Sequence, residues 1–468
     1  MYNNIKEDLH FFNELINELI NDELTNPVAV AIPPEKLHLK FDLELKSSPA
    51  IAKDFKKELK KIVLNTPKSS SKLFFNQLFG GRHSKAILGD LLAVMLNNSM
   101  ATYKIAGPQV GVEKEIIKQV NTLIGYPKGC GGTFPTGGSM SNFMSLIMAR
   151  DKKDKEIKNK GVQGKLIAYT SENSHYSIAK NASFAGIGKE NIRYIKSNEK
   201  GQMDITCFKT QVEEDLANGF LPFYLNATAG TTVLCAFDKT SELAPICKRY
   251  NIWLHLDGAL GGTVIFSEKY KYLVKGVSQA DSFCFNAHKT LGAPLSTSVL
   301  AVKDKKDLYN SFNNDANYLY QTDDENYNLG QTSFECGRRN NALKLWTLWK
   351  AIGTDGLAKI VEHEFSLADS ARNYVKANAE YTLYSFEDSL SVCFNYKDFD
   401  AKDLCTKLYE KNKLMVGFGS FHGNTFVRLV AISGENSKQD MLNFFEILED
   451  FAANNSLLLK RRHRKIIK

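Results

Sequence analysis

The stretch IWLHLDGALGG, residues 252–262, decides the fold class that the sequence predicts. Its first part, IWLHLD, is a short apolar run of the kind that forms a buried strand. The run ends at Asp257, and Gly258 and Ala259 follow it. This order places a carboxylate at the edge of a sheet, with room above it for a flat group.

Similar apolar runs lie on both sides of this stretch and alternate with helix-like segments. The runs are KLIAYT (165–170), PFYLNA (222–227), SFCFN (282–286) and SVLAV (298–302), and the segments between them include DITCFKTQVEEDLANG and TSELAPICKRY. This alternation predicts an α/β fold with a mostly parallel central sheet that helices flank on both faces. In such a sheet, ligands gather at the carboxyl ends of the strands.

The chain before and after this region has a different pattern. Residues 1–73 predict a helical N-terminal arm that serves as a dimerisation segment, with helical spacing in IAKDFKKELKKIV and alternation in HLKFDLEL. Residues 74–348 form the predicted large, cofactor-binding domain. Residues 349–468, with a long helix, two short strands and a closing helix, predict a small C-terminal α/β domain.

The composition is that of an ordinary globular protein. Of the 468 residues, 43% are hydrophobic and 24% are charged. The formal net charge is +8, but six positive charges belong to the terminal KRRHRKIIK at 460–468, so the rest is nearly balanced. A balanced body gives no reason to expect a nucleic-acid groove, and a short basic terminus is usually a solvated end.

The cysteines and the apolar runs bear on the compartment. Eight cysteines are scattered along the chain without a C-x-x-C pair, which favours reduced thiols in a cytoplasmic protein and argues against a bound structural metal. The first 20 residues are amphipathic and acidic, unlike a signal peptide. No apolar run reaches the roughly 18–20 residues of a membrane span, so we expect none.

Four predicted strand ends carry polar residues that would be unusual in a core. Asp257 ends IWLHLD, and Lys289 follows SFCFN in NAHK. His175 lies in SENSHYSIAK after KLIAYT, and Thr231 lies in NATAGTT after PFYLNA. Each residue alone has an ordinary structural explanation. Together they match the needs of pyridoxal 5'-phosphate, which requires an amine, an acid at its ring nitrogen, a stacking group and an anion cradle.

Each of these residue types suits its part of the cofactor chemistry. An aspartate keeps the pyridine nitrogen protonated, so that the ring can accept electrons from the substrate α-carbon. A lysine must attack as a neutral amine, which desolvation favours. The segment GGTFPTGGSMSNFMSLIMAR (131–150) offers glycines, Ser139 and Ser141 before an apolar helix, where a phosphate can bind to backbone N–H groups.

Several motifs in order give the chain a family resemblance. NAHK (286–289) is similar to the lysine motif N-P-H-K, and HLDGALGG (255–262) to H-V-D-A-A-x-G-G, both of the group II pyridoxal-phosphate-dependent amino acid decarboxylases. The chain resembles the branch of animal-type glutamate decarboxylase and cysteine sulfinate decarboxylase from FFNQL at 74 to FVRLVAIS at 426–433. The resemblance implies an aspartate-aminotransferase-like (type I) fold and a homodimer with active sites at its interface.

The resemblance also implies roles for individual residues. It implies that Lys289 holds the cofactor as a Schiff base, and that further cofactor contacts come from Asp257, His175, Thr231, Met140, Ser141, Asn286 and His288. Tyr318 matches a loop tyrosine that protonates the substrate carbon after CO₂ has left, which completes a catalytic set with Lys289, Asp257 and His175. Arg428 and Gln77 match residues that dock a substrate carboxylate, either the α- or the side-chain group.

The reaction that we expect is α-decarboxylation of a small acidic L-amino acid: glutamate, aspartate or cysteine sulfinate. The products would be CO₂ and an ω-amino acid or hypotaurine. Two segments depart from the family pattern, TLGAP after Lys289 and TYKIAGPQ, in which Lys104 replaces an acid. Lys104 is either an extra cation for a shorter acidic substrate or a surface change.

Three alternatives remain open. The first is a decarboxylase of aromatic or diamino acids, and the second is another carbon–carbon or carbon–sulfur lyase on the same fold. The third is a cofactor-binding relic that acts as an interaction protein.

Overall fold

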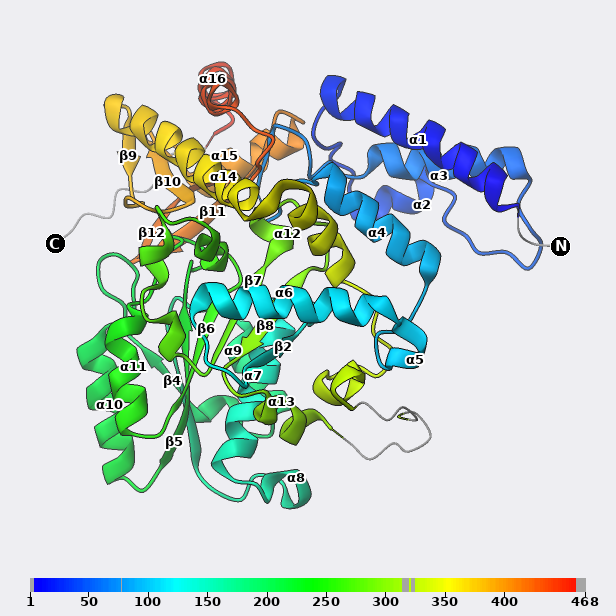
Figure 1. The fold of residues 1–468 in the computed structure, drawn as a ribbon. Helices are drawn as coiled ribbons and strands as arrows, with labels where there is room; N and C mark the ends of the chain where they lie inside the picture. The colour runs from blue at the N-terminus through cyan, green and yellow to red at the C-terminus, as the bar shows by residue number, and fades with distance from the viewer. Residues whose placement is uncertain (1–3, 77, 314–319, 321–324, 460–468) are drawn as a thin grey trace.

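The computed structural model describes residues 4–76, 78–313, 320 and 325–459, which form two sheets with surrounding helices (Figure 1). Within these residues, no helix is both long and apolar enough to cross a membrane.

The larger sheet has the topology that the alternating pattern predicts. Its seven strands lie in the order β2-β8-β7-β6-β5-β3-β4. The strands are β2 (Gly131–Thr133), β3 (Leu166–Ser171), β4 (Ile192–Ile195), β5 (Leu221–Thr228), β6 (Trp253–Gly258), β7 (Ser282–Asn286) and β8 (Ser298–Val302). The five strands from β4 to β7 in this order are parallel, and β8 is antiparallel to both of its neighbours. The predicted mostly parallel sheet is therefore confirmed.

Helices cover both faces of this sheet because its central strands are buried on both sides. One core packs side chains of the sheet against α6 (Pro108–Ile124), α10 (Ile205–Ala217), α11 (Thr240–Arg249) and the first part of α14 (Ala342–Ala377). The core on the opposite face packs the sheet against α7 (Gly138–Lys153), α9 (Ser177–Phe184) and α13 (Lys305–Phe312). Two covered faces explain why the strand sequences read as nearly continuous apolar runs.

The smaller sheet has the order β1-β11-β12-β10-β9. Its strands are β1 (Phe74–Phe75), β9 (Tyr381–Leu383), β10 (Ser391–Tyr396), β11 (Met415–Phe421) and β12 (Asn424–Val430). One face packs on α15 (Ala401–Glu410), α16 (Lys438–Asn454) and the second part of α14. Its other face contributes Cys393 and Phe426 to a small core with Leu234 of the larger sheet's β5–α11 connection.

The domain limits stay a prediction, and two elements bear on them. Residues 74 and 75 form β1, which pairs in parallel with β11 of the smaller sheet. Helix α14 crosses the expected limit at 348 and bends at Gly353, where φ is 70°. Only glycine adopts this φ without strain, so the bend is built into the sequence.

The N-terminal residues form helices beside α4 (Figure 1). They are α1 (Ile5–Thr25), α2 (Leu37–Lys40) and α3 (Ala52–Asn65), followed by α4 (Ser84–Leu96). Ion pairs join α1 to α3, with Lys60 Nζ 2.7 Å from the Glu18 carboxylate. HLKFDLEL begins in α2 and continues without regular structure, because its alternating residues have no neighbouring strand with which to pair.

The remaining elements are short. The short α-helices are α5 (Tyr103–Ala106), α8 (Ile157–Lys160) and α12 (Ala287–Thr290). Short 3-10 helices span Pro34–Lys36, Lys189–Asn191, Gly261–Phe266, Lys271–Val274, Val277–Gln279, Glu325–Tyr327 and Leu329–Thr332.

Candidate active site

Three of the expected site residues lie at the carboxyl ends of neighbouring strands. Asp257 is near the end of β6, Thr231 follows β5, and Lys289 follows β7 on α12. The parallel pairing of β5 with β6 and of β6 with β7 puts all three ends at one edge of the sheet. This is the edge at which open α/β sheets bind ligands.

The carboxylate of Asp257 is buried and held at both oxygens. Its side chain is only 3% exposed. Oδ2 accepts a hydrogen bond of 2.7 Å from Asn142 Nδ2, and Oδ1 accepts one of 3.0 Å from the backbone N–H of Ala259. These bonds fix the orientation of a group that has little freedom to turn toward water.

Asn142, which faces inward from α7, links Asp257 to His175. Its Nδ2 also lies 3.1 Å from Ser177 Oγ, and that hydroxyl lies 2.8 Å from His175 Nδ1. Its Oδ1 lies 3.0 Å from Nε2 of His255. One buried amide therefore positions groups from β6 and from the start of α9.

The imidazole of His175 is half-buried above this edge. Burial lowers the pKa of His175, and the charge of Asp257 only partly opposes that effect. The ring is therefore neutral at neutral pH, which suits stacking on a flat cofactor better than a hydrated cation would.

Lys289 has the properties of a reactive amine. Burial lowers the pKa of Lys289, while the charge of Asp257 acts in the opposite direction. A lowered pKa increases the fraction of neutral amine, the form that attacks a carbonyl. Backbone packing fixes the position of Lys289, because a Cβ at Gly80 would lie 2.4 Å from the Lys289 carbonyl oxygen.

A narrow space at the start of α7 is lined by small residues. A Cβ at Gly138 would lie 3.0 Å from the Ala259 Cβ and 3.1 Å from Asn286 Nδ2. Ser141 is fully buried one turn into the helix, and Met140 is half-buried beside it. Free N–H groups at the start of a long helix and a missing side chain together make a cradle for an anion.

Asn286 and His288 are fixed by the start of β8. Asn286 Oδ1 accepts a hydrogen bond of 2.6 Å from Ser298 Oγ, and His288 Nδ1 accepts one of 3.0 Å from the Thr297 N–H. Burial lowers the pKa of His288 to about 4, so the ring is neutral and its Nε2 carries the proton. His288 can therefore offer a phosphate a hydrogen bond but no positive charge.

Thr231 and Arg428 meet near the β5–α11 connection. Thr231 Oγ1 accepts a hydrogen bond of 2.9 Å from the Ala236 N–H, so the hydroxyl proton of Thr231 can be donated to another group. Arg428 of β12 donates 2.9 Å bonds to the carbonyls of Thr232 and Asn76. Each terminal guanidinium nitrogen has a second N–H beyond these bonds. Gln77 and Tyr318, the other two expected site residues, lie outside the described residues.

Three further residues of the site, Asn142, Ser177 and His255, were not predicted from the sequence. A signal existed for His255, which precedes Asp257 by two residues and so shares its face of the strand. Asn142 is four residues after Gly138 in the glycine-serine segment, and an amide inside an otherwise apolar helix face needs a buried partner. Nothing in the sequence identified that partner as Asp257.

These residues fit pyridoxal 5'-phosphate. The cofactor has an aldehyde, a pyridine nitrogen and a phosphate, and the site offers a counterpart to each. The counterparts are the Lys289 amine, the Asp257 carboxylate and the start of α7 near Asn286.

Comparison with known proteins agrees with this geometry. A family model described as the pyridoxal-dependent decarboxylase conserved domain matches residues 34–397. The acidic amino acid decarboxylase GADL1 of Mus musculus is 34% identical over 87% of this chain and 78% of that protein. Cysteine sulfinic acid decarboxylase of Homo sapiens is 36% identical over 77% of this chain and 74% of that protein.

A solved structure extends the likeness to three dimensions. The crystal structure of mouse CSAD aligns with a TM-score of 0.90 at 30% identity, over 95% of this chain and 98% of that one. The predicted type I fold is therefore confirmed. The chain belongs to the pyridoxal-dependent decarboxylases, and it is an amino acid decarboxylase that uses pyridoxal 5'-phosphate.

Proposed function

We propose that the protein catalyses α-decarboxylation of a small acidic L-amino acid: aspartate, glutamate or cysteine sulfinate. The products are CO₂ and an ω-amino acid or hypotaurine. The names of the two relatives described above support this substrate class, since one acts on acidic amino acids and the other on cysteine sulfinic acid.

The observation that carries the mechanism is the buried Asp257 carboxylate, held by Asn142 at the sheet edge that also carries Lys289. When bound, pyridoxal phosphate supplies a conjugated ring that takes up the electron pair left as CO₂ departs. Asp257 holds the proton of the ring nitrogen by charge and by a fixed orientation. Lys289 would hold the cofactor covalently through its amine.

The other predicted residues hold the cofactor and finish the reaction. The imidazole of His175 covers the ring face, and Thr231 donates its hydroxyl proton to the cofactor. Met140, Ser141, Asn286 and His288 surround the phosphate, to which a neutral His288 donates through Nε2. Tyr318 delivers a proton to the substrate carbon.

We assign the substrate carboxylate to Arg428 and Gln77. The guanidinium of Arg428 is held by two backbone carbonyls, so it can present its remaining N–H groups with little loss of side-chain entropy. Lys104 lies exposed on α5.

Product identification tests the proposed activity. Purified protein with added pyridoxal phosphate is incubated separately with aspartate, glutamate, cysteine sulfinate, an aromatic amino acid and a diamino acid. We expect CO₂ and the matching amine only from acidic substrates, and neither from Lys289→Ala. Turnover of an aromatic or diamino acid alone would support the first alternative, and cleavage without CO₂ the second. A protein that binds the cofactor and transforms no substrate would be a relic.

We also propose a homodimer through α4. Six large apolar side chains on this helix are 41–54% exposed, and four of them, at positions 88, 91, 92 and 95, lie on one face. Their spacing forms one helical stripe, which a second copy of the chain would cover. Sedimentation velocity should show a dimer, and Leu91→Glu with Leu92→Glu should give a monomer. A wild-type monomer would refute this part.

The cysteines indicate the compartment of the protein. All eight cysteines are free thiols in the structure, and five of them are buried. Free thiols on this scale are typical of a reducing compartment, so we place the protein in the cytoplasm.

A further inference from the structure

A cavity of about 400 Å³ lies at the edge of the larger sheet opposite the Asp257 site. Strand β6 begins there at Trp253, β7 begins just after Asp281, and β8 ends just before Lys303. Helices α7 and α11 end at the same place. The cavity is therefore distinct from the catalytic edge, to which the same strands run.

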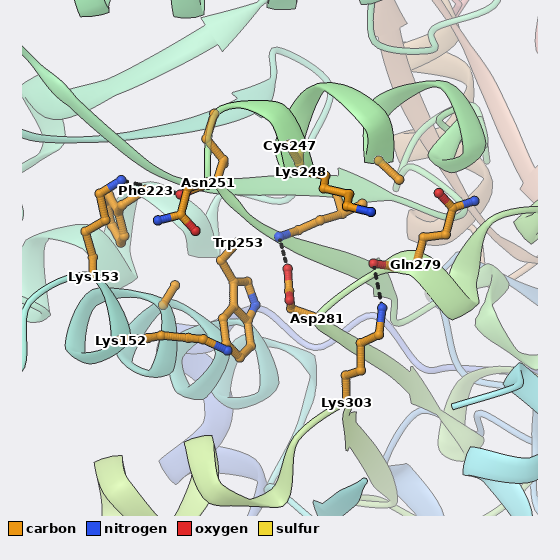
Figure 2. A pocket seen from close by; sticks show the side chains of 14 residues that line it. Lys152, Lys153, Phe223, Cys247, Lys248, Asn251, Trp253, Gln279, Asp281 and Lys303 are labelled. Atoms are coloured by element: carbon orange, nitrogen blue, oxygen red, sulfur yellow. Dashed lines mark hydrogen bonds between the residues drawn. The ribbon is translucent and has the colours of Figure 1, made fainter. Parts of the chain in front are cut away.

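Four lysines surround this cavity. Figure 2 shows Lys152 and Lys153 on one side and Lys248 and Lys303 on the other, with Trp253 and Asp281 between them. Lys152 has a carboxylate partner, since its Nζ lies 2.9 Å from Asp307. In the described part of the chain, the other three form no ion pair with a carboxylate.

Lys153 and Lys303 contact neutral backbone carbonyls, and the nearby charge of Asp281 acts on Lys303 without forming an ion pair. Lys153 Nζ lies 3.4 Å from the Asn251 carbonyl, and Lys303 Nζ lies 3.3 Å from the Gln279 carbonyl. The one acid that lines the cavity, Asp281, accepts a hydrogen bond of 2.8 Å from the Leu254 N–H. Burial lowers the pKa of Lys153, so its charged form is costly without an anion nearby.

Helix dipoles account for only part of this arrangement. Lys152, Lys153 and Lys248 lie in the last turns of α7 and α11, where a cation stabilises the helix end. Lys303 is not on a helix and has no such reason to point into the cavity. The dipole explanation also does not account for the space between the lysines, whose size is that of a small-molecule site.

A chain of hydrogen bonds leads from the cavity wall to the proposed cofactor site. Trp253 Nε1 donates 2.9 Å to Ser282 Oγ, which lies 2.8 Å from His255 Nδ1. The same imidazole contacts Asn142, and Asn142 holds Asp257. A ligand that shifts Trp253 would thus act on the groups that orient the catalytic carboxylate.

We propose that this cavity is an effector site for a compact polyanion, a metabolite with several phosphate or carboxylate groups. Three ammonium groups against one carboxylate select for multiple negative charge, and the small volume excludes long chains. The effect of the polyanion on the decarboxylation rate rests on the function proposed above, whereas its binding to the cavity does not.

Isothermal titration calorimetry tests the site on cofactor-loaded protein, in which the phosphate cradle is already filled. The probes are tripolyphosphate and citrate, used separately at low salt, and the probe that binds identifies the anion chemistry. Lys248→Ala with Lys303→Ala should weaken binding at least tenfold. Lys248→Arg with Lys303→Arg should retain it, because the charge is kept.

The matched control is Lys189→Ala with Lys200→Ala, which removes the same charge from exposed positions outside the cavity. This variant should bind within twofold of the wild type. The proposal is overturned if neither probe binds the wild type, or if the Lys248/Lys303 alanine variant binds as tightly.

The decarboxylation rate at saturating substrate supplies the second readout. The binding probe should change this rate in the wild type and the arginine variant but not in the alanine variant. An effect that persists in the alanine variant would come from the active site and would overturn the effector role. Binding without any change of rate would overturn that role as well.

Discussion

Replacing Asn142 by alanine tests the buried amide that orients the catalytic carboxylate. Asn142 donates the 2.7 Å bond to Asp257 Oδ2, and its amide also contacts Ser177 Oγ and His255 Nε2. A hydrogen bond to a charged group contributes roughly 1.5–3 kcal/mol. If this energy is expressed fully in the transition state, kcat should fall by a factor of roughly ten to 150.

The assay is steady-state CO₂ release at saturating substrate and cofactor, with the cofactor dissociation constant measured in parallel. Asn121→Ala is the matched control, because Asn121 is also a buried asparagine but donates 3.2 Å to a neutral carbonyl, that of Gly131. The control should lose stability without losing kcat once cofactor is saturating. A folded Asn142→Ala enzyme with kcat within twofold of the wild type would refute the reasoning.

Three further substitutions test other parts of the site. Asp257→Asn keeps the shape but not the charge and should lower kcat by several powers of ten, so near-normal turnover would rule out the electrostatic role. Burial lowers the pKa of His255 to about 4. The contribution of the neutral His255 ring to the free energy of unfolding is therefore fully present above pH ~6.5 and is lost as the pH falls toward 4. In urea titrations at several pH values, His255→Gln should reduce the loss of unfolding free energy between pH ~6.5 and ~4 by on the order of 3 kcal/mol. The same loss in the variant and the wild type would contradict this role of His255. Tyr318→Phe should shift the products from amine toward aldehyde, with activity restored by fresh cofactor, whereas an unchanged ratio would remove Tyr318 from the mechanism.

Five strands of the larger sheet, β3, β5, β6, β7 and β8, could be predicted closely because they are buried on both faces, whereas β2 and β4 were not predicted. SFCFN and SVLAV coincide with β7 and β8 residue for residue. The smaller sheet was harder to assemble from the sequence. Strand β1 is two residues long and pairs with β11, more than 300 positions away, and no local pattern indicates such a partner.

The site could be predicted in its residue types but not in its connections. Asp257 and Lys289 stand out because a charged residue directly after a buried strand is unusual. Asn142 gives no comparable signal, because its importance depends on the packing of α7 against the ends of β6 and β7. The neutrality of His288 likewise depends on burial, which its sequence neighbours do not reveal.

The most direct test of the account is to locate the covalently bound cofactor. Cofactor-loaded protein is reduced with borohydride, digested and analysed by mass spectrometry, with Lys289→Ala treated in parallel. We predict that the reduced cofactor is found on the peptide that contains Lys289, and that the variant carries no label on any peptide. Label on another lysine of the wild type, or none at all in catalytically active protein, would contradict the assignment of this site.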